Sequence, residues 1–292
     1  MTDVLSLGEL CALGSALLWA VNSMMLRTRS HQVSPAAMNV IRCGCAGLFF
    51  WVWLPLSNPL EGLDQVSGEE WLLLIGSIVV GMVTGDTLYL TAIREIGLSR
   101  ALALSSTYPL TTLLFEWLLL SRPASPGLAL GCVLVAGGVV LLSGRGQEPE
   151  SRPQRLKYGV SLSLAAAVLW GLSTVMLYPA VAHLTLVQAN AVRMPLVALL
   201  LYLIRIRSTA EFRDLDRRTL LVVAGSGLIG MGVSSLMYLA SIKLIGATKA
   251  VTLTSVSPVF GLILSVAFLK EKVGLRVLVG IAACMGGVWL VL

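Results

Sequence analysis

The stretch Asn39-Val-Ile-Arg42 recurs as Asn190-Ala-Val-Arg193, and each copy lies inside a long apolar run. The same offset relates Leu18-Trp19 to Leu169-Trp170. Chance similarity between two apolar segments is common, but a register that keeps asparagine, arginine and tryptophan in step is not. This register indicates an internal duplication.

The match continues through the rest of each copy, after a small change in loop length. It joins Tyr89-Leu-x-x-Ile-x-x-Ile-Gly97 to Tyr238-Leu-x-x-Ile-x-x-Ile-Gly246, Pro109 to Pro258, and Gly137-Gly138-Val139 to Gly286-Gly287-Val288. We therefore predict a first repeat over residues 1–143 and a second over 158–292. The polar stretch 144–157 is the expected linker.

The composition places these repeats in a membrane. Of 292 residues, 57% are hydrophobic and only 12% are charged, against roughly 25% charged in soluble domains. Reading for apolar runs of about 20 residues predicts about ten transmembrane helices. They lie near 7–26, 34–56, 71–93, 99–120, 126–143, 158–180, 184–204, 219–242, 248–269 and 273–292. The fold class is an all-α membrane protein with two five-helix repeats.

The basic residues give an orientation. Five spans per unit is an odd number, so the second repeat is expected to be inverted relative to the first. Most of the 21 Lys and Arg residues fall in loops after odd-numbered spans, and only Arg122, Lys243 and Lys249 lie in the other loops. The positive-inside rule then places both termini outside a cell (inner or plasma) membrane. The net charge of +6 is read as this loop bias, with no nucleic acid as partner.

The matched residues resemble a known family. Leu17-Leu18-Trp19, Asn39-Val-Ile-Arg42 and Tyr89-Leu-x-Ala-Ile are similar to the first repeat of the EamA-type branch of the drug/metabolite transporter superfamily. The segments Ala247–Pro258 and Phe268-Leu-Lys-Glu271 resemble its second repeat. The resemblance covers nearly the whole chain. It implies a ten-helix transporter, commonly an exporter of amino acids, metabolites or drugs, with a central cavity between the repeats.

Two features depart from that family's pattern. Family members often carry basic loops that place the termini in the cytoplasm, whereas the charges here indicate the reverse. The fourth span ends in Leu120-Ser-Arg-Pro123, where the family often has Leu-x-x-Glu.

Charged residues inside predicted spans are the main candidates for the transport site, because each costs about 2.5–3.5 kcal/mol to insert. Arg42 and Arg193 are matched cations that either bind anionic substrate groups or anchor their helices by snorkelling. Asp86 is expected at a depth similar to that of Arg42, so the two could form an ion pair. The second repeat has Ser235 at the position of Asp86, and a substrate or proton site is expected where the repeats differ.

Glu116, near the far end of the fourth span, either belongs to the pathway or reaches water and headgroups. Both histidines fall in predicted loops, so Asp86 and Glu116 are the candidates to carry a coupling proton.

Pro109 and Pro258 are expected to interrupt the fourth and ninth spans at matching positions. Proline removes a backbone hydrogen bond, and broken helices often mark the binding region of transporters. The alternative is an ordinary kinked span. The remaining candidates are polar side chains that either line the cavity or join helices: Asn22, Asn39, Asn190, Tyr89, Tyr108 and Tyr238.

No cofactor or metal is expected. The five cysteines lack CxxC spacing, and no histidine completes a zinc pattern. The glycines at 137, 138, 286 and 287 allow close packing, either inside the bundle or in a homodimer through the fifth and tenth spans.

The predicted function is therefore secondary transport of a small-molecule substrate across the lipid bilayer, most simply as an exporter of metabolites or amino acids. An importer or facilitator is the alternative on the same fold. A membrane-embedded enzyme is disfavoured, because the loops are short and no HExxH or GxSxG motif occurs.

Overall fold

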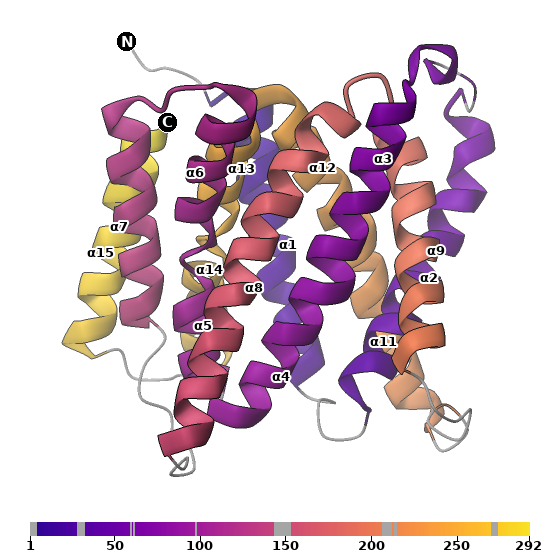
Figure 1. The fold of residues 1–292 in the computed structure, drawn as a ribbon. Coiled ribbons are helices and arrows are strands. Elements are labelled where there is room, and N and C mark those ends of the chain that lie inside the picture. The colour runs from indigo at the N-terminus through magenta and orange to yellow at the C-terminus, as the bar shows by residue number, and fades with distance from the viewer. Residues whose placement is uncertain are drawn as a thin grey trace.

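The protein is a bundle of helices that run side by side (Figure 1). The computed structural model describes residues 5–27, 33–58, 60, 62–96, 98–142, 153–205, 212, 215–269 and 274–292. Within these ranges, seven helical stretches are long and apolar enough to cross a membrane, and three shorter apolar helices lie over Tyr108–Leu120, Pro126–Leu142 and Leu275–Val291. The all-α membrane fold predicted from the sequence is confirmed.

The first repeat contains five spans. They are α1 (Leu7–Arg27), α2 (Pro35–Trp53), α3 (Gly68–Ser77) continued by the π-helical segment η3 (Ile78–Gly85) and α4 (Asp86–Ile96), α5 (Leu98–Ser105) followed by α6 (Tyr108–Leu120), and α7 (Pro126–Leu142). Two 3-10 turns, η1 (Leu54–Leu56) and η2 (Leu63–Gln65), lie between α2 and α3.

The second repeat follows the same order. Its spans are α8 (Pro153–Ala180), α9 (Leu186–Arg205), α11 (Arg217–Gly227) continued by the π-helical segment η4 (Leu228–Val233) and α12 (Ser234–Ile245), α13 (Ala247–Thr254) followed by α14 (Ser257–Leu269), and α15 (Leu275–Val291). Since α8 begins at Pro153, the end of the expected linker is helical. Proline suits a first helical turn, where its missing N–H would have no partner. Residues 143–152 lie outside the described ranges.

Polar residues begin several of these spans in the way their sequence indicates. Ser67 accepts from the backbone N–H of Glu70, and the Glu70 carboxylate accepts from the backbone N–H of Ser67, which makes a capping box. Asp216 caps α11, and Ser34 caps α2 directly before Pro35. These contacts satisfy N–H groups that have no partner within the helix.

The two repeats are inverted relative to each other. The chain enters α1 at the end of the molecule that carries both termini, and it enters α8 at the opposite end (Figure 1). Equivalent helices pack in pairs, α2 on α9 and α7 on α15. This pairing is what a twofold relation with its axis in the membrane plane requires.

Glycines bring α7 and α15 into close contact. A Cβ added at Gly138 would lie 2.7 Å from the carbonyl oxygen of Gly280, and one added at Gly131 would lie 2.9 Å from that of Gly287. The inverted repeat relates these two contacts to each other. At Gly137 and Gly286 an added Cβ meets nothing within 4 Å. One glycine of each Gly-Gly pair therefore packs inside the bundle.

The first helix of each repeat packs mainly on the other repeat. Helix α1 contacts α11, α12, α13 and α14, whereas α8 contacts α3, α4, α5 and α6. This exchange brings side chains that are distant in sequence into one central region.

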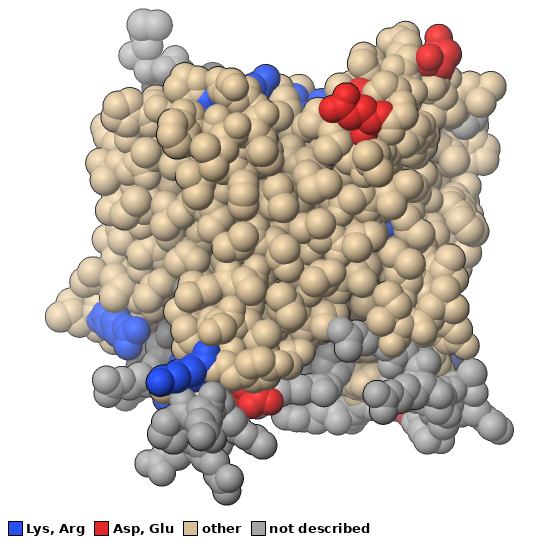
Figure 2. Space-filling view, viewed as in Figure 1, with Lys and Arg blue, Asp and Glu red and all other residues tan. Residues whose placement is uncertain are grey.

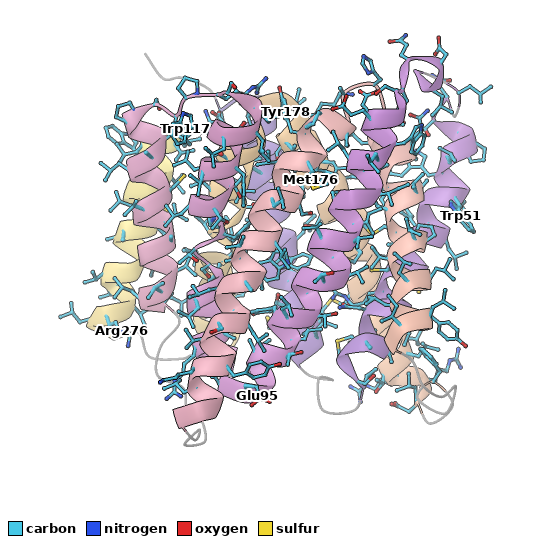
Figure 3. All side chains as sticks on the ribbon, viewed as in Figure 1. Trp51, Glu95, Trp117, Met176, Tyr178 and Arg276 are labelled. Atoms are coloured by element: carbon cyan, nitrogen blue, oxygen red, sulfur yellow. The ribbon has the colours of Figure 1, made fainter. Side chains whose placement is uncertain are left out.

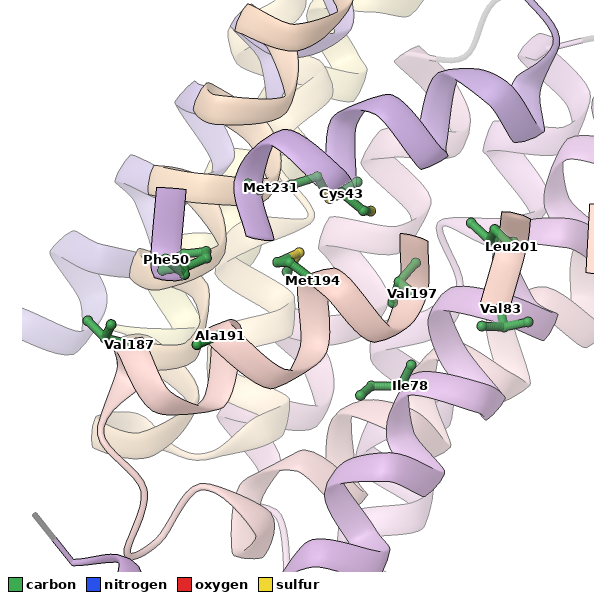
Figure 4. Close-up of a cluster of buried hydrophobic side chains, with 11 residues drawn as sticks. Cys43, Phe50, Ile78, Val83, Val187, Ala191, Met194, Val197, Leu201 and Met231 are labelled. Carbon is green, nitrogen blue, oxygen red and sulfur yellow. The ribbon is translucent and has the colours of Figure 1, made fainter. Parts of the chain in front are cut away.

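The core between α2, α9 and the π-helical segments is apolar (Figure 4). Phe50, Ile78 and Met194 are nearly inaccessible to solvent there. This packing holds α2 and α9, which carry the two intramembrane arginines, against η3 and η4.

The outer wall of the bundle suits lipid. Figure 2 shows a broad surface almost free of charge, with Lys, Arg, Asp and Glu gathered near its two ends. Trp51 and Trp117 lie toward the end with the termini, and Glu95 and Arg276 toward the other (Figure 3). Trp51, Trp53 and Trp289 are exposed, as expected of interfacial anchors. The 21 residues of α1 span about 31 Å at 1.5 Å per residue, close to the hydrocarbon thickness of a bilayer.

Candidate functional site

A cavity of about 380 Å³ lies between the two repeats. Its wall is built largely from matched residues, one from each repeat. These pairs are Trp19 and Trp170, Arg42 and Arg193, Gly81 and Gly230, Met82 and Met231, Asp86 and Ser235, Tyr89 and Tyr238, Ser105 and Thr254, and Ser106 and Ser255. The cavity therefore lies at the inverted repeat's symmetry element.

The π-helical segments η3 and η4 shape this wall. Gly81 in η3 lies directly against the hydroxyl of Ser173, and its counterpart Gly230 in η4 lies against the side chain of Asn22. An alanine at either position would collide with the first helix of the other repeat. π-Helical turns are rare in proteins and are found frequently at functional sites. Here η3 ends directly before Asp86, and η4 ends two residues before Ser235.

Arg42 points into the cavity from α2, yet only 5% of it is exposed. Its Nη1 donates to Oδ1 of Asn39 at 2.9 Å, and its Nη2 donates to Oδ1 of Asn22 at 3.3 Å. The guanidinium also lies 5.8 Å from the ring centroid of Trp19. The side chain is thus held in the bundle rather than directed to the membrane surface, so the snorkelling interpretation does not apply.

Arg193 has an equivalent setting on α9 and is 7% exposed. Its Nη1 donates to Asn190 Oδ1 at 3.2 Å and to Ser235 Oγ at 3.5 Å, while Nη2 lies 3.6 Å from Met82 Sδ. The arginine and the asparagine three residues before it therefore form the same unit in both repeats.

Asp86 lines the cavity but does not form the ion pair with Arg42 that the sequence allowed. Its Oδ1 accepts from Nε1 of Trp170 at 2.8 Å, and no carboxylate lies within 4.0 Å of either cavity arginine among the described residues. The distance of Arg42 and of Asp86 from the ends of their spans predicted a similar depth in the membrane. That distance does not specify the direction in which each side chain points. The partner instead comes from α8 of the other repeat.

The Trp170 ring, which donates this hydrogen bond, packs against two tyrosine rings. The Trp170 ring centroid lies 5.1 Å from that of Tyr89 and 5.9 Å from that of Tyr108. Tyr238, the residue of the second repeat that matches Tyr89, shares a 3.0 Å hydrogen bond with Thr174. The cavity wall is therefore aromatic as well as charged.

The fourth and ninth spans break where the prolines indicated. α5 ends at Ser105 and α6 begins at Tyr108, and α13 ends at Thr254 while α14 begins at Ser257. Residues at both breaks line the cavity, including Pro258; Pro109 is buried away from it. The hydroxyls of Thr254 and Ser255 donate to the carbonyls of Ala250 and Val251 in the last turn of α13, so both hydroxyls have partners at the break.

Glu116 does not line the cavity. Its Oε2 accepts from the backbone N–H of Thr248 at 2.8 Å, in the first turn of α13. A helix N-terminus offers N–H groups without intrahelical partners and a partial positive charge, which explains why a carboxylate lies there. The residue joins the two repeats.

The remaining candidates divide into two groups. Asn39, Tyr89, Tyr108 and Tyr238 line the cavity, whereas Asn22 and Asn190 are buried behind it and orient the arginines. Site residues missed from the sequence include Trp19, Trp170, Ser173 and Thr174. Trp19 and Trp170 occupy matched positions of the two repeats. A tryptophan kept at the same position in both repeats was the signal that could have identified them.

Several contacts between the repeats lie toward the end of the bundle that carries the termini. Lys249 Nζ lies 2.6 Å from Glu9 Oε1, and His183 Nδ1 lies 2.7 Å from Glu70 Oε1. Arg122 stacks over the ring of Tyr178 at 4.4 Å. Each of these contacts joins one repeat to the other.

The described residues hold no cluster of three His, Cys, Asp or Glu side chains suited to a metal ion. The cavity wall supplies two cations, one carboxylate, hydroxyls and aromatic rings, a set that can bind a small organic molecule reversibly.

Comparisons with known proteins agree with this architecture. The model of the EamA-like transporter family matches residues 6–144 and again 157–292. An uncharacterized transporter of Archaeoglobus fulgidus is 28% identical over 273 residues, which cover 93% of each chain. A solved structure titled "Crystal structure of protein" superposes with a TM-score of 0.77 at 18% identity, covering 97% of this chain and 95% of the other, which shows the shared fold.

Proposed function

Because the chain belongs to the EamA-like transporter family, we propose that it is a secondary transporter that exports small metabolites or amino acids by alternating access. The observation that carries this proposal is the cavity between the repeats, whose wall is formed by matched residues of both. Rocking of one repeat against the other would expose such a cavity to each side of the membrane in turn.

In this proposal, the contacts at the end with the termini belong to a state that is closed toward that side. The Glu9–Lys249 ion pair and the contact of Glu116 with α13 both cross between repeats. In the proposed cycle they break when the cavity opens to that side.

We further propose that the protein lies in the cell (inner or plasma) membrane with both termini outside, as the loop charges indicate. Cells that release substrate would then load it from the end opposite to the termini. Import or facilitated diffusion on the same frame is the second candidate; a flux that follows the solute gradient in either direction, without coupling, would favour it.

The first experiment identifies the substrate. Metabolites inside and outside cells that express the protein are compared with those of cells that lack it. An exported solute accumulates outside only in cells that express the protein. If no solute differs between the two cell lines, the proposed export is wrong.

The second experiment measures the cavity's role directly. In vesicles loaded with the identified solute, Asp86→Asn should lower flux at least tenfold, because the Trp170 contact loses its charge-assisted character. Glu69→Gln, which removes a carboxylate outside the cavity, is the matched control. Equal flux for the Asp86 variant and this control would remove Asp86 from the mechanism.

A further inference from the structure

The hydrogen-bond partners of the two buried arginines point to the charge of the ligand. All of their described side-chain partners are neutral: Asn39 and Asn22 for Arg42, and Asn190, Ser235 and Met82 for Arg193. The Nε atom of each guanidinium is buried and has no hydrogen-bond partner within the described part of the chain. Two equivalent donors, one from each repeat, are thus left unused beside the same cavity.

The cavity wall is not electrically balanced. Among the described residues that line it are Arg42 and Arg193 but only one carboxylate, Asp86, whose Oδ1 already accepts from Trp170. Counted as ionised groups, the wall carries one positive charge in excess. Unbalanced charge surrounded by lipid and apolar protein is costly unless a counter-charge approaches it.

The rest of the wall indicates what accompanies that counter-charge. Trp19, Tyr89, Trp170 and Tyr238 present aromatic surface, and Met82 and Met231 add apolar, adaptable side chains. An inorganic anion would leave this surface unused. The volume of about 380 Å³ lies in the range of small-molecule sites.

We infer that the cavity binds a small organic anion of net charge −1, with its carboxylate held by Arg42 and Arg193 and its apolar body packed against the aromatic wall. This inference rests on the proposed function and narrows its substrate class. A guanidinium is suited to a carboxylate because its planar donors match the two oxygens. A zwitterion would leave the excess charge of the wall uncompensated.

A matched ligand series tests the charge directly. Purified protein in nanodiscs is titrated by calorimetry with 3-phenylpropanoate, 3-phenylpropanamide, phenylalanine and 2-phenylethylamine, which share one phenylethyl body. Hexanoate and hexanamide repeat the comparison with an aliphatic body. Each anion should bind at least tenfold more tightly than its uncharged partner, and 3-phenylpropanoate at least tenfold more tightly than the zwitterion or the cation. Equal binding within the series, or no binding by either anion, would overturn the inference.

Variants test where the charge is recognised. Arg42→Gln and Arg193→Gln should each weaken anion binding at least tenfold, while Arg218→Gln, which removes an exposed cation outside the cavity, should not. Asp86→Asn should strengthen anion binding about threefold or more, because it raises the excess positive charge. A damaged fold cannot produce that gain, so weaker anion binding by Asp86→Asn counts against the inference. If the glutamine variants do not fold, Arg42→Lys and Arg193→Lys, which keep the charge, replace them. Their affinities for the anion are then compared with that of Asp86→Asn.

The experiments distinguish a failure of the anion-binding inference from a failure of the proposed transport function. Anion binding without any flux in vesicles would support the site while contradicting the proposed transport. Flux of an uncharged or zwitterionic solute, with no anion binding, would support transport while contradicting the anion site.

Discussion

The indole nitrogen of Trp170 holds the carboxylate that lines the cavity. Trp170 is carried by the second repeat and Asp86 by the first, so this 2.8 Å bond also links the two halves. Its counterpart Trp19 has a different role, since its ring lies beside the Arg42 guanidinium. The matched tryptophans therefore contact different groups: Trp170 donates to a carboxylate, and Trp19 lies beside a cation.

This difference allows a matched substitution. Trp170→Phe keeps an aromatic ring but removes the donor to Asp86, and it should lower the free energy of unfolding by about 1.5–3 kcal/mol, as for hydrogen bonds to charged groups. Trp19→Phe keeps the ring beside Arg42 and should have a smaller effect. Thermal unfolding in detergent compares the two variants. Equal destabilisation would mean that the Asp86 bond contributes nothing beyond ring packing.

Helix packing between α7 and α15 depends on one glycine of each adjacent pair. Gly138→Ala would place a methyl group 2.6 Å from Cys284 Sγ and 2.7 Å from the Gly280 carbonyl. We expect a loss of about 1–3 kcal/mol, because overpacking forces the helices apart. Gly137→Ala meets nothing within 4 Å and should be neutral or stabilise the helix by up to about 1 kcal/mol.

The same comparison can be made in the second repeat with Gly287→Ala and Gly286→Ala. The unfolding temperatures of the four variants test whether only one glycine of each pair is needed for the packing of α7 on α15. A homodimer through this surface stays a prediction; if the glycines at 137 and 286 served it, their alanine variants would shift the apparent mass in light scattering without lowering stability.

The ion pair of Glu9 and Lys249 joins α1 to α13, and in the proposed cycle it keeps the cavity closed toward the termini. Glu9→Lys or Lys249→Glu replaces attraction by repulsion, so each should favour opening toward the termini. The double exchange restores the pair and should restore closure.

A cysteine in place of Leu177, a buried residue of the cavity wall, reports this opening through its alkylation rate. We expect a rise of about threefold or more for each single variant, since a partly exposed pair contributes up to about 1 kcal/mol. Equal rates in the single and double variants would show that the pair does not control access.

Orientation of the whole molecule can be measured with two leucines that are similarly exposed. Leu60 is 80% exposed at the end with the termini, and Leu275 is 77% exposed at the other end. If the termini lie outside, an impermeant maleimide labels Leu60→Cys on intact cells and Leu275→Cys only after permeabilisation. Cys11 and Cys45 are replaced by alanine in both variants to remove background. The reverse pattern would place the termini in the cytoplasm.

The sequence predicts the frame of the molecule better than its interior. Apolar run length gives the spans, and the constant register of Asn39–Arg42 with Asn190–Arg193 gives the duplication. The breaks at Pro109 and Pro258 follow from the chemistry of proline. These features are local, or repeat at a fixed spacing, so they can be read without knowing which helices touch.

The contacts of the site depend on helix exchange between the repeats. Trp170 reaches Asp86 only because α8 packs on the first repeat, and Glu116 reaches Thr248 only because α6 meets α13. Neither periodicity nor depth along a helix specifies such partners. The π-helical segments before Asp86 and Ser235 were missed for a related reason, since glycine-rich spans permit several helical geometries.

Joining both halves in one chain lets each half diverge. Two identical subunits around an axis would present the same group to both sides of a ligand on that axis. Here one side offers a carboxylate at Asp86 and the other a hydroxyl at Ser235. A bound molecule therefore has one preferred orientation, and mirror-image ligands, which cannot present the same three groups to this wall, should differ in affinity.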